Sequence, residues 1–163
     1  MEKYSKILLK PGRYLEESKL DEALAERDFV SIANVGSIKH PTEWQRDWIT
    51  IGVLATKSSP RTSRNGKKFI TFTLSDLENH EMTLNLWDGA YHDHWQTELG
   101  QVFCVMNAKP YEKLFSIDIS SCLMLVGESR DYGPCRGVLE NGPCPHYVNK
   151  KYGQMCMRHN IRY

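Results

Sequence analysis

The chain has 163 residues with 21 basic and 20 acidic side chains, which gives a formal net charge of +1 at pH 7. Bulk charge therefore indicates no polyanionic partner, and no run approaches the ~20 consecutive apolar residues of a membrane-spanning helix. The first residues hold only the short apolar patch 7–9 before Pro11, which is not the pattern of a secretory signal. Without such a signal, the odd count of five cysteines favours a reducing compartment over a disulfide framework.

Positive charge is concentrated in two segments. Residues 130–163 carry 6 basic and 2 acidic groups, and residues 56–68 carry basic groups without a single acid. Exposed Lys and Arg are ordinary, so taken alone each segment also fits a solvated loop. The basic residues of segment 56–68 are Lys57, Arg61, Arg64, Lys67 and Lys68.

The first third of the chain, residues 1–47, is expected to be an N-terminal arm. Residues 14–28 are rich in good helix formers and weakly amphipathic through Leu20 and Leu24, which predicts a short helix docked on the main body. The rest of the arm has no clear period.

The middle of the chain has the patterns of β-strands. Residues 48–56 are apolar and β-branched, and Gly52 in their centre indicates a bulge or bend in one long strand. Residues 69–75 and 81–87 alternate strictly between apolar and polar side chains, which predicts a hairpin.

A short helix over residues 88–99, with Asp88 as a possible N-cap, separates this hairpin from two further predicted strands at 101–108 and 115–120. Three strands, a helix and two strands is the order of an OB-fold. The sequence therefore predicts a mainly β protein with a five-stranded OB-fold barrel over residues 48–129.

OB-folds usually bind oligonucleotides or oligosaccharides across strands two and three, between the loop joining strands one and two and the loop joining strands four and five. The basic segment and residues 109–113 fall at these two loops. We expect phosphate contacts from cations and base stacking on Phe69, Trp87 and Tyr111, although each aromatic also fits the core of a small barrel. The expected cations are Lys57, Arg61, Arg64, Lys67, Lys68, Lys109 and Lys113, with Lys150, Lys151 and Arg158 extending the track.

Residues 130–163 contain Cys135, Cys144, Cys156 and His159, a C-x8-C-x11-C-x2-H array. Three thiolates and one imidazole form a typical closed, structural zinc site. The segment is rich in Gly and Pro and poor in apolar residues, so we expect one Zn2+ to bind as this zinc finger folds. His146 is a further imidazole that could replace one of these ligands only if the three thiolates did not all bind the ion.

The sequence resembles the minichromosome maintenance protein 10 family over about residues 44–160. The matching blocks are WITIGVL (48–54), PRTS (60–63), NGK (65–67), LSDL (74–77), HWQTELGQV (94–102), GE (127–128), YGPC (132–135) and NGPC (141–144). The resemblance implies a nuclear, eukaryotic replication factor that is not an enzyme and whose OB-fold and Cys-Cys-Cys-His finger form one DNA-binding unit. It also implies binding to single-stranded and duplex DNA, and contacts with the hexameric replicative helicase, DNA polymerase alpha and the sliding clamp. Residues 113–118 match the place of a proposed clamp-binding motif, but a barrel strand explains their alternation as well.

Other functions remain open from the residues alone. A zinc-stabilised OB-fold adaptor could use the basic loop to hold acidic protein surfaces without binding DNA. An RNA-binding Cys-Cys-Cys-His finger shares the first cysteine spacing, although the later intervals fit it poorly. No phosphate-binding glycine loop or local nucleophile signature supports an enzyme, and a helix would point His92 and His94 about 200° apart.

Overall fold

Strands with a strict two-residue alternation form the centre of the molecule. The computed structural model describes residues 4–12, 14–37, 47–111, 114–139, 142–144 and 146–153. Strands β4 (Lys68–Ser75) and β5 (Glu81–Trp87) pair antiparallel along their whole length, and the apolar side chains of their alternation are buried. The predicted hairpin is therefore confirmed.

The other predicted strands are present with small changes in their bounds. They are β2 (Trp48–Lys57), β6 (Gln101–Met106) and β8 (Leu114–Ile117). Four strands were not predicted: β9 (Leu123–Glu128) and the short strands β1 (Asp28–Phe29), β3 (Arg61–Thr62) and β7 (Lys109–Tyr111). In the part of the chain that is described, no helix is long and apolar enough to cross a membrane.

The strands form a nine-stranded sheet in the order β7-β8-β5-β4-β2-β6-β9, with β1 paired to β2 and β3 paired to β4. The strands β5 and β8 are parallel. Within the described residues this path is open, so the prediction of a five-stranded barrel is wrong in strand number and closure. Asn107 adopts φ 56° and interrupts the expected fourth strand, so β6 pairs with β2 while β7 turns to pair with β8.

Strand β2 is long enough to serve two neighbours. Residues 49–53 pair with β6, and residues 53–57 pair with β4 through a register shift between Leu54 and Thr56. The predicted irregularity therefore lies next to Ala55 and not at Gly52. Gly52 instead permits close packing, because a Cβ at this position would lie 3.0 Å from Ile32 Cδ1.

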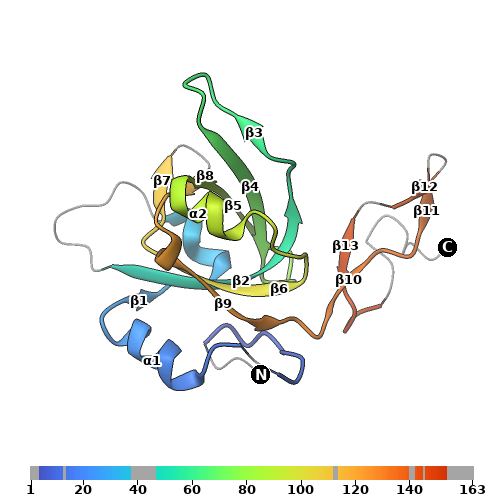
Figure 1. Ribbon diagram of the computed structural model, residues 1–163. Helices are drawn as coiled ribbons and strands as arrows, with labels where there is room; N and C mark the ends of the chain where they lie inside the picture. Colours follow the sequence, from blue (N-terminus) through green and yellow to red (C-terminus); the bar gives the residue numbers. More distant parts are fainter. Residues whose placement is uncertain are drawn as a thin grey trace.

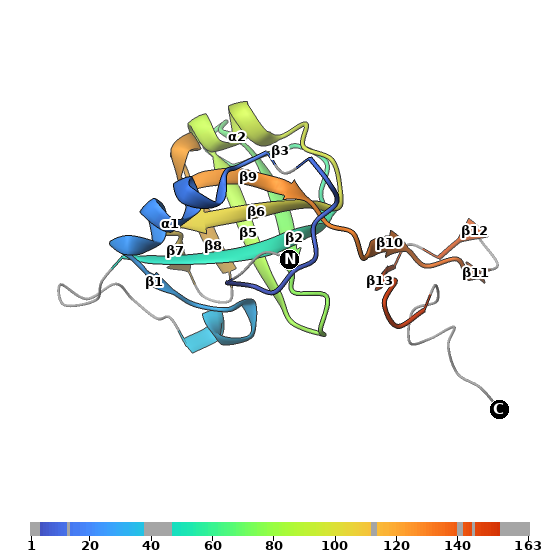
Figure 2. The ribbon, with the colours of Figure 1, turned by 90° about the horizontal axis from the view of Figure 1, so that it is seen from below.

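The N-terminal residues pack on the outer face of β2, β6 and β9 (Figure 2). Helix α1 (Glu17–Ala25), shorter than predicted, buries Leu20 completely, and Ile7 joins the same cluster. The backbone N–H of Lys10 donates to the carbonyl of Glu128 at 2.8 Å. Strands β2 and β6 are consequently buried on both faces, and a short 3-10 helix, Ile32–Ser37, packs against the first core cluster.

Helix α2 (Asp88–His94) follows β5 directly and is shorter than the predicted span. Beyond Trp95 the chain turns toward β6, and Gly100, with φ 90°, donates its N–H to the carbonyl of Leu54 at 2.8 Å. Ala90 is fully buried, so α2 packs on the interior of the sheet.

The C-terminal segment lies to one side of the sheet, as Figure 1 shows. It contains two small antiparallel pairs, β10 (Tyr132–Pro134) with β13 (Tyr147–Asn149) and β11 (Val138–Leu139) with β12 (Gly142–Pro143). Tyr132 Oη donates to the carbonyl of Ala55 at 2.8 Å, and Tyr147 Oη donates to Glu81 Oε2 at 2.7 Å. These bonds fix the segment to the β2 and β5 region of the sheet.

Candidate nucleic-acid interface

The outward face of β4, β5, β8 and β7 carries one continuous row of side chains. Residues in register on neighbouring strands share a face, and the register joins Thr71 to Asn85, Asn85 to Ser116 and Ser116 to Lys109. Thr71 Oγ1 donates to Asn85 Oδ1 at 2.7 Å. A polar surface therefore crosses four strands, on the side opposite the buried apolar residues.

An aromatic and cationic stack stands at the end of this face. Phe69 and Trp87 are register partners, and their rings stack with centroids 4.3 Å apart and an interplanar angle of 21°. The guanidinium carbon of Arg61 lies 4.9 Å from the centroid of the Phe69 ring, and Arg61 also donates to Thr71 Oγ1. Both rings are half-buried, so they line the surface and do not belong to the core clusters.

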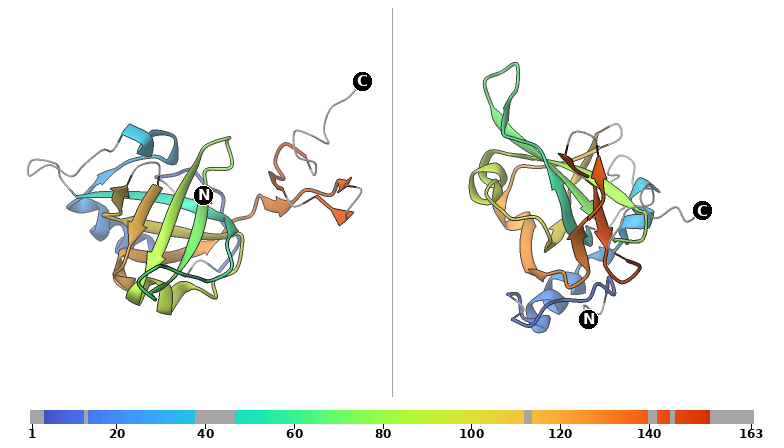
Figure 3. Two further views of the ribbon diagram at one scale, coloured as in Figure 1. Left: turned by 90° about the horizontal axis from the view of Figure 1, so that it is seen from above. Right: turned by 90° about the vertical axis from the view of Figure 1, so that its right-hand side faces the viewer.

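The basic hairpin formed by β3 and β4 projects away from the body of the sheet beside this stack (Figure 3). Its tip turns at Gly66, which adopts φ 79°, and Ser63 donates its N–H to the carbonyl of Lys67 at 2.8 Å. Arg64, Lys67 and Lys68 are all exposed. The hairpin therefore carries three solvent-exposed cations on the segment that leads into Phe69.

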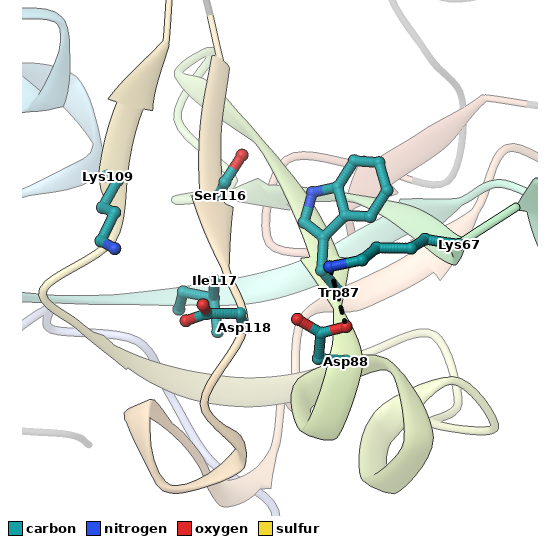
Figure 4. Close-up of a pocket in the computed structure, with 7 residues that line it drawn as sticks. All are labelled: Lys67, Trp87, Asp88, Lys109, Ser116, Ile117 and Asp118. Carbon is teal, nitrogen blue, oxygen red and sulfur yellow. Dashed lines mark ion pairs between the residues drawn. The ribbon is translucent and has the colours of Figure 1, made fainter. Parts of the chain in front are cut away.

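A pocket of about 150 Å³ opens between the hairpin and β8. Figure 4 shows Lys67 reaching along Trp87 toward Asp88, while Lys109, Ser116 and Asp118 come from β7 and β8 and the residue after it. Lys67 Nζ lies 3.8 Å from Asp88 Oδ1, and the two side chains are 62% and 54% exposed. Two cations and two carboxylates thus line the same pocket as the indole ring of Trp87. The lining residues are Lys67, Trp87, Asp88, Lys109, Ser116, Ile117 and Asp118.

Three polar lining residues were not predicted as site residues: Asp88, Ser116 and Asp118. The alternation of β8 places Ser116 and Asp118 on the polar face, so period alone could have found them. Asp88 was predicted to be an N-cap, which is wrong. Trp87 is the N-cap, and Asp88 is the first helical residue with φ 47° and a side chain paired with Lys67.

Other predicted contacts lie away from this face. Lys57 Nζ donates to the carbonyls of Trp95 at 3.3 Å and Thr97 at 2.7 Å, so its charge is held at the end of α2. Lys150 and Lys151 follow β13, which is anchored at the opposite end of the β4–β5 hairpin. The seven residues of β5 separate the two ends by about 20 Å.

Lys113, Cys156, Arg158 and His159 lie outside the described residues, and the structure describes only the backbone of Tyr111, in β7.

The first two predicted zinc ligands lie in one small buried cluster. Cys135 and Cys144 are 4% and 5% exposed and share this cluster with Val148. Gly137 donates its N–H to Cys135 Sγ at 3.3 Å, and Cys144 Sγ lies 3.2 Å from His146 Nδ1. Among the described residues, no three His, Cys, Asp or Glu side chains gather as a set of metal ligands.

Comparisons with known proteins identify relatives of this chain. The family model described as MCM10 OB-fold matches residues 3–125, which confirms the OB-fold prediction. The chain is similar to the protein MCM10 homolog of Danio rerio, with 28% identity over 98% of this chain and 20% of the relative. The protein MCM10 homolog of Mus musculus is 30% identical over 98% of this chain and 19% of its own length. The DNA replication licensing factor mcm10 of Schizosaccharomyces pombe is 27% identical over 69% of this chain and 21% of its own length. The chain spans about a fifth of the length of these relatives.

Proposed function

The chain belongs to the MCM10 family, and from that premise we propose that it is a DNA replication factor that binds single-stranded DNA on the outward face of β4, β5, β7 and β8. One observation carries the proposal: the Arg61, Phe69 and Trp87 stack is flanked by cations of the basic hairpin and of β7. Single-strand binding needs flat side chains on which bases stack and cations that follow phosphates. This face has both kinds of side chain, since Trp87, Lys67 and Lys109 line the same pocket.

The cations have distinct roles in this proposal. Arg64, Lys67 and Lys68 sit on the projecting hairpin and contact phosphates from one side, while Lys109 contacts them from the opposite side of Trp87. Lys57 serves the fold through its bonds to the end of α2. Duplex DNA carries the same phosphates, so we propose weaker binding to it through the hairpin alone.

The test is fluorescence anisotropy with a labelled oligonucleotide of about 10 nucleotides over a salt series. The variant Lys67→Glu/Lys68→Glu removes two phosphate contacts, so its log–log salt slope should fall by about 1.4 and its affinity should collapse at low salt. Lys6→Glu/Lys19→Glu makes the same change in charge at exposed positions of the N-terminal segment and should bind almost as well as the unmodified protein. Equal binding by both variants contradicts the proposed face and favours the adaptor interpretation.

For the C-terminal segment we propose one structural zinc ion held by Cys135, Cys144, Cys156 and His159. Two observations support the fit: the first two thiols are buried in one cluster, and the Gly137 N–H donates to Cys135 Sγ, a bond that stabilises a thiolate. The ion would supply folding free energy to a segment with little apolar area, and no catalytic chemistry.

The cellular role that we propose is a scaffold in the nucleus. Its partners would be the hexameric replicative helicase and DNA polymerase alpha, with the sliding clamp as a further partner. The proposal rests on family membership, and the relatives are about five times longer than this chain. Pull-down of each purified partner with this chain tests it, and the Lys67→Glu/Lys68→Glu variant separates DNA-dependent from direct contacts.

A further inference from the structure

The pocket beside Trp87 has a composition that phosphate binding does not explain. Asp88 and Asp118 contribute carboxylates to the same lining as Lys67 and Lys109. A carboxylate repels a phosphate, and an exposed lysine pair alone would have bound the backbone better. The Lys67–Asp88 pair is loose, at 3.8 Å with both side chains more than half exposed, so the acid stays accessible to a ligand. The pocket therefore suits a neutral group that has both donors and acceptors.

The size and walls of the pocket fit one nucleobase. Its volume of about 150 Å³ equals that of about five water molecules, enough for one flat heterocycle. Trp87 supplies an aromatic wall, and Phe69 stacked behind it fixes the orientation of the indole. In Figure 4 the indole nitrogen lies on the side of the ring toward Ser116, so polar groups surround the opening.

Among the four bases, guanine matches these groups best. Its Watson–Crick edge presents two adjacent donors, N1–H and the N2 amino group, that a carboxylate can accept together. Its O6 and N7 atoms are acceptors that lysine contacts. Cytosine and adenine each offer one amino group, and thymine would turn carbonyl oxygens toward the carboxylates.

We propose that this pocket takes a single unstacked base of the bound strand and selects guanine through Asp88 and Asp118. The inference rests on the proposed single-strand binding and adds sequence preference to it. Trp87 supplies the stacking surface, and Lys67 and Lys109 contact O6 or the adjoining phosphates.

The test compares an oligothymidine of about 11 nucleotides with the same strand carrying one central guanine, by anisotropy at fixed salt. A good bidentate contact discriminates bases by roughly 5- to 150-fold, and the exposure of Asp88 puts the expected preference for the guanine strand near 5-fold. A central inosine, which lacks the N2 amino group, should bind with intermediate affinity. A single guanine also avoids four-stranded structures.

Isosteric variants assign the preference to the pocket. Asp88→Asn and Asp118→Asn should each lower the guanine preference below about 2-fold, because each removes a carboxylate that accepts from the base; the preference is the ratio of the two strands' Kd values measured in the same variant. Asparagine tolerates the left-handed backbone of Asp88, with φ 47°, so this variant keeps the local fold. Asp93→Asn is the matched control, since Asp93 is exposed on α2 and does not line the pocket, and it should retain the full preference.

The outcomes separate the two proposals. Equal, salt-dependent binding of both strands overturns the guanine pocket and leaves single-strand binding intact. A preference that persists in both aspartate variants also overturns it. Failure to bind either strand refutes the proposed function itself.

Discussion

Replacing Trp87 with alanine separates base stacking from phosphate binding on the proposed DNA face. Phe69 covers one face of the indole at a centroid distance of 4.3 Å, so one face remains for a base. Stacking contributes about 1–3 kcal/mol per base, and a single available face puts the expected loss at about 1–1.5 kcal/mol, or roughly 5- to 13-fold in Kd. Trp87 is half-buried, so the variant should also lose about 2 kcal/mol of unfolding free energy, roughly half the cost at a fully buried position.

The assay is anisotropy with a short single strand at several salt concentrations, together with urea denaturation. The salt slope should stay constant in Trp87→Ala because no phosphate contact is removed, in contrast to the lysine variants. Trp95→Ala is the matched control, since Trp95 is 37% exposed but caps the C-terminal end of α2 and does not line the pocket, whereas Trp87 caps the N-terminal end. An equal loss of affinity in both tryptophan variants, or a reduced slope in Trp87→Ala, would refute the assignment of stacking to Trp87.

Three further predictions concern stability and metal. Gly52→Ala should destabilise the fold by about 1–3 kcal/mol in urea denaturation because its Cβ would lie 3.0 Å from Ile32 Cδ1, whereas Gly36→Ala, with nothing within 4 Å, serves as the control and should cost less. Burial raises the pKa of Tyr147 above its ordinary value of 10.0, so its neutral form stabilises the folded state fully below about pH 10, and this contribution is lost as the pH rises further. Tyr147→Phe should therefore reduce the loss of unfolding free energy between about pH 9.5 and 11, and a pH profile identical to that of the unmodified protein would contradict this prediction. Atomic emission should find about one zinc ion per chain, and a Cys135→Ser variant that keeps full zinc content would rule out the predicted ligand set.

Strand positions were predictable where one face of a strand is buried and the other is open. The hairpin β4–β5 shows this pattern, with Phe72 and Leu84 fully buried between half-buried polar neighbours. Strand β9 was missed because its burial does not alternate, since Leu123 packs in the first core cluster and Val126 packs in the cluster that includes the N-terminal residues. A strand covered on both sides lacks the two-residue period on which the prediction depends.

The sequence by itself determined the OB order of the main strands, the hairpin of residues 69–75 and 81–87, and the basic segment between the first two of these strands, because each depends on residues close together in the chain. Only the tertiary structure decided which charges share a surface. Lys57 is bound to carbonyls at the end of α2, while Asp118 joins Lys67 at one pocket although 50 residues separate them. The physical reason is that alternation fixes which face a side chain occupies, whereas its neighbours on that face depend on the register between strands that are distant in sequence.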